Sequence, residues 1–325
     1  MDGILESGID LVVWLQTHAA LLAPLMRALS FLGTTEFLLL LGLTVYWCLD
    51  ARTGVRLGLL LISGAAFGAL LKLAFHMPRP YWYDARVLAM AGEPTYGMPS
   101  IPALYAWSIA PWLGGRIRRG WGEAMGVFLA LGISVSRVFL GVHFPGDVLA
   151  GFAAGVVVWF FVGAGIRFLG PVLTRAGFVL QCVAAVSVSA AILLGQAVIL
   201  RGLEASADPT LWAENAARVS AVLPRDPNPV ISLAGLILGM GVGLACKVRW
   251  APFDVEGSVA KRSLRLLLGL MVALMLWGGL AVLWIGVPQP MQTFLRYLRY
   301  GLVGLWTVFL APWLFLRWGL AERKA

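Results

Sequence analysis

Long apolar segments separated by short polar loops run through most of this sequence. The first of them, FLGTTEFLLLLGLTVYWCL, covers roughly residues 31–49. Crossing about 30 Å of hydrocarbon takes roughly 20 apolar residues, and such a segment must be helical because lipid offers no partner to open backbone groups. The composition agrees, since 60% of the residues are hydrophobic and only 13% are charged. We therefore expect an all-α fold, a polytopic transmembrane helix bundle.

The expected bundle has about nine spans and one further helix at the N-terminus. The spans lie near residues 31–49, 55–75, 101–115, 121–141, 146–168, 177–200, 229–246, 263–286 and 293–317. Residues 1–28 mix Glu6 and Asp10 with apolar residues at helical spacing, which predicts an amphipathic helix on the membrane surface, with an extra span as the alternative. All dense polar motifs fall in a transmembrane core, residues 29–170. Residues 171–325 form a four-span extension.

The basic residues predict how the bundle is oriented. The net charge is +9, and if alternate loops share a side, fifteen of the 25 Lys and Arg residues fall on one side and nine on the other. The richer side of a membrane protein faces the cytoplasm. The polar motifs lie on the poorer side, so we expect a multi-pass cell-membrane protein with its site on the extracytoplasmic face. No aromatic residues interleave a basic patch, so we expect no nucleic-acid partner.

Three polar segments fall on that face. KLAFHMPRP (72–80) ends the second span, YGMPSIPAL (96–104) opens the third, and SRVFLGVHFPGD (136–147) links the fourth and fifth. Snorkelling to the interface explains one basic residue at a span end, but it explains three of them poorly. The three cations would repel one another unless an anion lay among them. They are Lys72, Arg79 and Arg137.

A histidine and an aspartate in the third segment are four residues apart. If Pro145 opens a helix, His143 lies just before its first turn and Asp147 just inside it. The carboxylate can then hold one imidazole nitrogen and leave the other free to react. The same helix N-terminus favours a bound anion. This pattern indicates a nucleophile or base beside a phosphate group. The three cysteines lie far apart and show no metal-binding spacing.

Together these motifs resemble those of the type 2 phosphatidic-acid phosphatase superfamily, the membrane lipid phosphate phosphatases. That family has K-x6-RP, PSGH and SR-x5-H-x3-D motifs, and the first and third match here at every defining position. The resemblance implies that His143 attacks phosphorus to form a phosphohistidine, oriented by Asp147. It implies a lipid phosphate or diphosphate substrate and no metal or other cofactor. It also implies a phosphate clamp of Lys72, Arg79, Ser100 and Arg137.

The second motif departs from the family pattern, because it reads PSIP instead of PSGH. The family's histidine, which protonates the leaving oxygen, is replaced by Pro102, and losing a general acid costs about 10²–10⁴ in rate. Proline disfavours a helical residue before it, so we expect the helix to begin at Pro102 and Ser100 to lose its capping position. The branched side chain of Ile101 is expected in the phosphate pocket. His76 is a candidate replacement acid, and an interfacial loop histidine is the alternative.

The missing acid leaves three hypotheses for the function. The first is a lipid phosphatase that is impaired or inactive. The second is a non-catalytic protein that binds or transports lipid phosphates, and the third is a transferase that passes a head group or phosphate from the phosphohistidine to an acceptor. A diphosphate leaves as phosphate, whose second pKa is about 6, so it needs little protonation and should be the preferred substrate. Residues 171–325 are candidates for an acceptor pocket, for scaffold or for a homo-oligomer contact.

Overall fold

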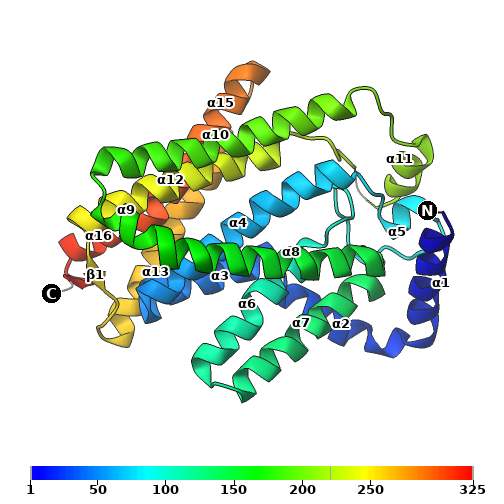
Figure 1. Ribbon diagram of the computed structural model, residues 1–325, viewed down its shortest axis with the longest axis horizontal. Helices are drawn as coiled ribbons and strands as arrows, with labels where there is room; N and C mark the ends of the chain where they lie inside the picture. The colour runs from blue at the N-terminus through cyan, green and yellow to red at the C-terminus, as the bar shows by residue number, and fades with distance from the viewer. Residues whose placement is uncertain (1, 220, 324–325) are drawn as a thin grey trace. The chain divides into compact units, whose positions relative to one another are not determined.

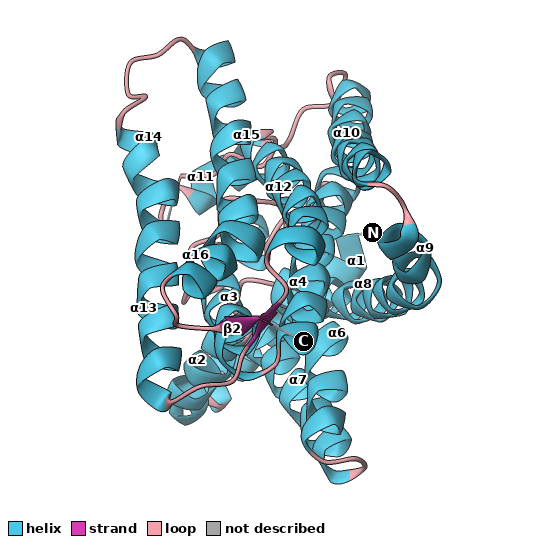
Figure 2. Ribbon diagram, turned by 90° about the vertical axis from the view of Figure 1, so that its left-hand side faces the viewer, coloured by secondary structure: helices cyan, strands magenta, loops and turns pink. Residues whose placement is uncertain are grey.

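A computed structural model describes residues 2–219 and 221–323; Met1, Ser220, Lys324 and Ala325 lie outside the described residues. This part of the chain is almost entirely helical (Figures 1 and 2). Its helices are α1 (Asp2–His18), α2 (Ala23–Leu32), α3 (Thr35–Thr44), α4 (Ala51–Phe75), α5 (Pro80–Tyr83), α6 (Ile101–Ile117), α7 (Trp121–Phe139), α8 (Pro145–Ala164), α9 (Gly170–Arg175), α10 (Phe178–Leu203), α11 (Thr210–Ala216), α12 (Asn228–Trp250), α13 (Val259–Leu274), α14 (Leu280–Val282), α15 (Gln289–Leu305) and α16 (Ala311–Arg317). Two short strands, β1 (Phe253–Asp254) and β2 (Glu322–Arg323), pair antiparallel with Phe253 opposite Arg323. The predicted all-α, polytopic class is confirmed.

Seven helices among the described residues are long and apolar enough to cross a membrane, fewer than the nine predicted spans. The difference lies in the two predicted spans near residues 31–49 and 101–115. The first is the short apolar helix Thr35–Leu49, in which a π-helical turn continues α3. The second is α6, whose 17 residues reach about 26 Å at 1.5 Å per residue, short of the roughly 30 Å of hydrocarbon.

The N-terminal segment is two helices, where the sequence predicted one. Helices Gly3–His18 and Ala20–Leu32 meet at an angle of 81° and make an eighth span if they count as one. The break falls between His18 and Ala20, and Pro24 follows in the first turn of α2, where a residue without an N–H and with a fixed φ starts a helix readily. The location of this segment on the membrane surface stays a prediction.

The chain folds into two compact units that interleave along the sequence. Unit 1 comprises Met1–Leu38, Ser63–Phe161 and Ala197–Asp226. Unit 2 comprises Leu39–Ile62, Val162–Gln196 and Pro227–Ala325. Four of the five boundaries between the units fall inside α3, α4, α8 and α10, and the fifth lies between Asp226 and Pro227, before α12 begins. The predicted division into residues 1–28, 29–170 and 171–325 therefore stays a prediction, and every predicted site residue belongs to unit 1.

In unit 1, three helices pack around small apolar side chains. α6 and α7 form a hairpin, and α2 packs beside α7 (Figure 1). Their shared core contains Ala106, Ala130 and Ile133. α8 approaches α6 closely at Gly151 and Gly155, where an added Cβ would lie 2.6 Å from the carbonyl oxygens of Ser100 and Leu104. These glycines bring the first turns of α6 and α8 together, and both turns carry residues of the site.

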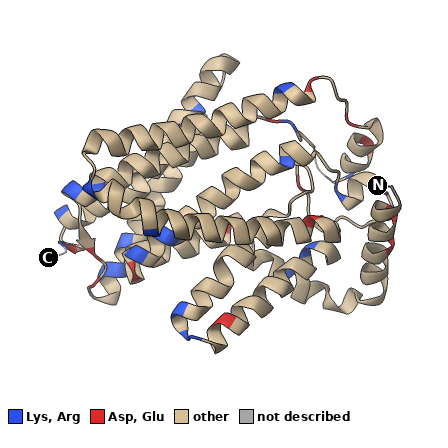
Figure 3. Ribbon diagram, in the orientation of Figure 1, with Lys and Arg blue, Asp and Glu red and all other residues tan. Residues whose placement is uncertain are grey.

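Unit 2 is built around a buried aromatic cluster. This cluster contains Tyr46, Trp47, Phe253, Trp306 and Phe315. The hydroxyl of Tyr46 donates to the carbonyl of Val308 at 2.7 Å, and the ammonium of Lys247 lies 4.8 Å from the centre of the Tyr46 ring. Most Lys and Arg residues of unit 2 gather at one end of its helices (Figure 3).

Candidate active site

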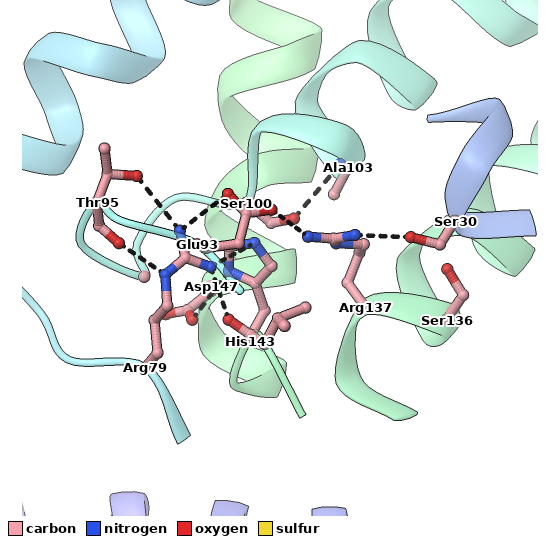
Figure 4. A network of polar contacts seen from close by, with 12 residues as sticks. Ser30, Arg79, Glu93, Thr95, Ser100, Ala103, Ser136, Arg137, His143 and Asp147 are labelled. Atoms are coloured by element: carbon pink, nitrogen blue, oxygen red, sulfur yellow. Dashed lines mark hydrogen bonds and ion pairs between the residues drawn. The ribbon is translucent and has the colours of Figure 1, made fainter. Parts of the chain in front are cut away.

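All six residues selected from the sequence come together within unit 1, and Figure 4 labels all of them except Lys72. Each is at most 7% exposed: Lys72, Arg79, Ser100, Arg137, His143 and Asp147. Lys72 lies in the last turn of α4, and Arg137 lies in the last turn of α7. Arg79 immediately precedes α5, and Ser100 immediately precedes α6. His143 lies just before the start of α8, and Asp147 lies in its first turn. The spacing within each motif therefore places every one of these side chains at the end of a helix. Their chemical roles stay predictions.

His143 and Asp147 are arranged as the sequence predicted. Pro145 opens α8, and Nδ1 of His143 lies 3.3 Å from Oδ2 of Asp147. The same carboxylate oxygen accepts the backbone N–H of Phe144 at 2.9 Å, which holds it in place. Burial lowers the pKa of His143 most strongly, and the neighbouring Arg79 and Lys72 lower it further, to well below its usual value. The imidazole is therefore neutral at pH 7, with one nitrogen directed at Asp147.

Backbone carbonyls hold two of the three cations. Arg79 donates to the carbonyl oxygens of Thr95 at 2.6 Å, Val142 at 2.9 Å and Tyr96 at 3.1 Å. Its Nη1 also lies 3.4 Å from Nε2 of His143. Lys72 donates to the carbonyl oxygen of Tyr96. Buried charges need such partners, and these contacts fix both cations beside the imidazole.

The second motif does not start its helix where the sequence predicted. α6 begins at Ile101, and Ser100 is its N-cap, with Oγ accepting from the N–H of Ala103 at 3.5 Å. Pro102 is tolerated inside the first turn because the N–H it lacks would have no partner in the helix. The expectation that Ser100 loses its capping position is therefore wrong.

Ile101 also differs from the expectation, because its side chain packs against α4. A Cβ placed on Gly68 would lie 2.1 Å from Cδ1 of Ile101, so glycine is what makes room for this side chain. Gly68 is one turn before Lys72. Ile101 therefore fills a gap between α4 and α6, and the prediction that its side chain occupies the phosphate pocket is wrong.

A carboxylate that sequence reasoning did not select lies among the cations. Oε1 of Glu93 lies 2.7 Å from Nη2 of Arg137, and Oε2 lies 3.8 Å from Nη2 of Arg79 (Figure 4). Nη1 of Arg137 donates to Oγ of Ser30 on α2 at 2.6 Å, while its buried Nε has no hydrogen-bond partner among the described residues. Burial pushes the pKa of Glu93 upward, but Arg79 and Arg137 outweigh burial and hold the pKa below its usual value. Glu93 is thus an anion at the centre of the cluster.

One signal in the sequence could have identified Glu93. It is the only acidic residue between Asp84 and Glu123, a stretch that contains the second motif. An isolated carboxylate a few residues before a predicted anion-binding segment is a natural partner for its cations. Its isolation in the sequence leaves no spacing to match against a motif, so the motifs alone do not predict it.

The segment between α10 and α12 also reaches the site from within unit 1. The hydroxyl of Tyr96 donates to Oδ2 of Asp208 at 2.8 Å and accepts from Nε of Arg225 at 3.0 Å. Asn215 donates to the carbonyl oxygen of Trp82 at 3.1 Å. Burial raises the pKa of Tyr96 to about 12, so its hydroxyl stays protonated. The structure has one short helix, α11, within this segment.

His76, the predicted alternative acid, lies at the edge of this cluster. It is exposed, its Nδ1 lies 3.2 Å from the carbonyl oxygen of Ala74, and its ring packs edge-on against that of Tyr96, with 6.3 Å between the ring centroids. Within residues 2–219 and 221–323, no group of three or more His, Cys, Asp or Glu side chains is arranged to hold a metal ion.

Two family models match separate ranges of the chain. The family model described as the PAP2 superfamily matches residues 53–168. A second model, described as the transmembrane extension of PAP2 superfamily phosphatases, matches residues 231–323. The first range contains all six predicted site residues together with Glu93. No curated protein sequence matches the chain.

Among solved structures, the chain is similar to the crystal structure of the first transmembrane PAP2 type phosphatidylglycerolphosphate phosphatase from Bacillus subtilis. The two share 21% sequence identity, and the TM-score is 0.44. The matched region covers 51% of this chain and 86% of that one.

Proposed function

We propose that this chain, which belongs to the PAP2 superfamily of phosphatases and carries that superfamily's transmembrane extension, removes phosphate from a lipid phosphate or diphosphate through a phosphohistidine at His143. The observation that carries the proposal is the placement of the imidazole. Its Nδ1 faces Asp147 at 3.3 Å, and its Nε2 faces the guanidinium of Arg79 at 3.4 Å. A proton on Nδ1 leaves the lone pair of Nε2 directed into the cation cluster.

The proposed first step is attack of Nε2 on phosphorus as the bond to the leaving oxygen breaks. Asp147 stabilises the positive charge that develops on the ring. The charges of Lys72, Arg79 and Arg137 stabilise the phosphoryl oxygens, so the protein contributes position and electrostatics. In the second step, water attacks the phosphohistidine, inorganic phosphate leaves, and His143 returns to its neutral form.

The leaving group decides how far the Ile101–Pro102 pair impairs this chemistry. Pro102 occupies the position of the family's acid and has no proton to donate. A lipid monophosphate leaves as an alkoxide and needs a proton, whereas a diphosphate leaves as phosphate and needs little help. We therefore expect diphosphates to be turned over faster than monophosphates with the same lipid chain.

The extracytoplasmic face remains part of the proposal. It is supported by the distribution of basic residues, which favours the side opposite the motifs by fifteen to nine. A site on that face would take substrate from the outer leaflet. Labelling of a single cysteine introduced at the exposed Arg86, in intact cells with a membrane-impermeant reagent, tests it; protection from the reagent would place the site on the other face.

The decisive experiment measures phosphate release by the purified full-length protein in detergent. Paired lipid monophosphate and diphosphate substrates are compared for the wild type, His143→Asn and, as a matched control, His18→Asn, at an exposed histidine of α1. We expect release by the wild type and by His18→Asn, and its loss in His143→Asn. Binding of lipid phosphate without release would instead support a binding or transport protein. Release that requires an added alcohol acceptor would support a transferase.

A further inference from the structure

The carboxylate of Glu93 sits where the proposed mechanism needs both an anion and a proton donor. Its two oxygens contact Arg137 and Arg79, the cations expected to hold the phosphate. Arg79 in turn contacts Nε2 of His143. The guanidinium of Arg79 therefore lies between Nε2 of His143, the proposed acceptor of phosphate, and the carboxylate of Glu93. Within the described residues, Asp147 is the other carboxylate of the cluster, and it is engaged with His143.

A single side chain, that of Tyr81, holds the backbone of Glu93. The hydroxyl of Tyr81 accepts the N–H of Glu93 at 3.0 Å and donates to the carbonyl oxygen of the same residue at 3.1 Å. The carboxylate, in contrast, is bound to the cations of Arg79 and Arg137. The Glu93 side chain is 34% exposed, so it exchanges protons with water. Glu93 thus combines a fixed backbone with a side chain that can change partners without leaving the site.

We propose that Glu93 is the catalytic proton donor to the leaving oxygen, in the role that Pro102 cannot fill. This inference rests on the proposed phosphatase function and names the residue that makes monophosphate hydrolysis feasible. It assigns to the loop between α5 and α6 the task that the family's second motif performs from the start of a helix.

Substrate binding explains why Glu93 changes from a carboxylate to a protonated carboxyl. A phosphate group with up to two negative charges competes with the single charge of Glu93 for Arg79 and Arg137. Once the phosphate neutralises these cations, burial and the nearby negative charge both favour the protonated carboxyl. Tyr81 keeps the backbone in place, so the released carboxyl stays beside the bound phosphate. Glu93 then takes a proton from water.

The proton balance closes over the two steps. In the first, Nε2 of His143 forms a bond to phosphorus, the P–O bond to the lipid breaks, and the carboxyl proton of Glu93 passes to the departing oxygen to give an alcohol. In the second, the Glu93 carboxylate takes a proton from the attacking water, the N–P bond breaks, and phosphate leaves. Glu93 is then protonated and His143 neutral, and as phosphate leaves, Glu93 returns its proton to water and pairs again with Arg79 and Arg137 as an anion.

The test compares Glu93→Gln with the wild type and with Glu214→Gln, a matched change at an exposed glutamate of the same unit. The readout is kcat/KM on a lipid monophosphate and on the diphosphate of the same chain length. This constant contains steps only up to departure of the first product, so the later hydrolysis of the phosphohistidine does not enter it. We expect Glu93→Gln to lose about 10²–10⁴ on the monophosphate, the usual effect of a general acid, and less than about tenfold on the diphosphate. Glu214→Gln should match the wild type.

Other outcomes overturn the inference. An equal loss on both substrates would make Glu93 a residue that positions the arginines, and a gain on both would make it only a counter-ion that competes with phosphate. If wild type releases phosphate and His143→Asn does not, either result overturns the role of Glu93 alone. A wild type that releases no phosphate from either substrate overturns the proposed function as well.

A second variant covers the case in which Glu93→Gln is not recovered from the membrane. Glu93→Asp keeps the charge and the proton but shortens the reach by one methylene. We expect a loss of roughly tenfold or more on the monophosphate, because a misplaced acid is a weaker one, with the diphosphate nearly unaffected. Equal kcat/KM losses on the two substrates would count against the inference here too.

Discussion

The hydroxyl of Tyr96 donates a 2.8 Å hydrogen bond to Asp208, which lies 112 residues later in the chain. The carbonyl of the same Tyr96 accepts from both Lys72 and Arg79. One residue therefore joins the cation cluster to the segment between α10 and α12. Arg225 completes the contact by donating to the Tyr96 hydroxyl at 3.0 Å and to Asp208 at 2.9 Å.

Arg225→Ala should lower activity although Arg225 lies outside all three motifs. Removing the guanidinium leaves the Asp208 carboxylate without its positively charged partner and the Tyr96 hydroxyl without a donor, and a hydrogen bond to a charged group contributes about 1.5–3 kcal/mol. The resulting shift of the Tyr96 carbonyl should reduce kcat/KM roughly tenfold, equivalent to about 1.4 kcal/mol. The exposed Arg201→Ala is the control for loss of charge. Equal activity of the two variants would show that the segment does not support the site.

Gly97→Ala should disrupt the site through a steric clash. An added Cβ would lie 2.6 Å from the carbonyl oxygen of Pro78 and 2.9 Å from Oδ2 of Asp147. The carboxylate that orients His143 must then move, and a displacement of about 1 Å costs on the order of 10²-fold in rate. Phosphate release checks this, with Gly146→Ala as the control because nothing lies within 4 Å of its added Cβ. Retention of full activity by Gly97→Ala would contradict the tight packing at this point.

Ser30→Ala should weaken the site from α2, an element with no motif residue. Oγ of Ser30 accepts from Nη1 of Arg137 at 2.6 Å, and both side chains are buried. Leaving that donor without a partner costs about 1–3 kcal/mol, so both thermal stability and kcat/KM should fall. Ser7→Ala is the comparison, since its hydroxyl is exposed and bonds within α1. An unchanged melting temperature and an unchanged kcat/KM for Ser30→Ala would rule out this support.

The imidazole of His143 should stay neutral in the folded protein at pH values where an ordinary histidine is protonated. The chain has three histidines, so NMR of histidine-labelled protein in detergent can assign the signal of His143 by its loss in His143→Asn. Because burial and the adjacent cations lower its pKa, the ring should remain neutral well below pH 6.5. The unfolded chain takes up this proton near pH 6.5, so the contribution of His143 to stability is full above that pH and is lost as the pH falls toward its lowered pKa. Titration of this signal near pH 6.5 would contradict the burial seen here.

The sequence predicts the membrane helices and the positions of the motif residues at helix ends, because both depend on local spacing. A run of apolar residues is a helix in lipid wherever it packs, and His143 and Asp147 meet because a helix started by Pro145 brings residues four apart onto one side. Lys72, Arg79 and Arg137 sit at helix ends for the same kind of reason. The wrong prediction about the start of α6 also concerned local structure. Pro102 does not delay the start of this helix, because the first turn of a helix does not use the N–H that proline lacks.

Only the tertiary structure decided which side chains complete the cluster. Glu93, Ser30 and Asp208 come from a loop, from α2 and from a segment more than 100 residues away, and no periodicity links them to the motifs. Their selection follows from charge and burial: three buried cations must be balanced by whichever acceptors the fold brings within reach. The sequence by itself thus determined the membrane helices and the histidine with its cations. Folding determined which anion lies among those cations, because residues that meet through long-range electrostatic contacts have no regular spacing in the sequence.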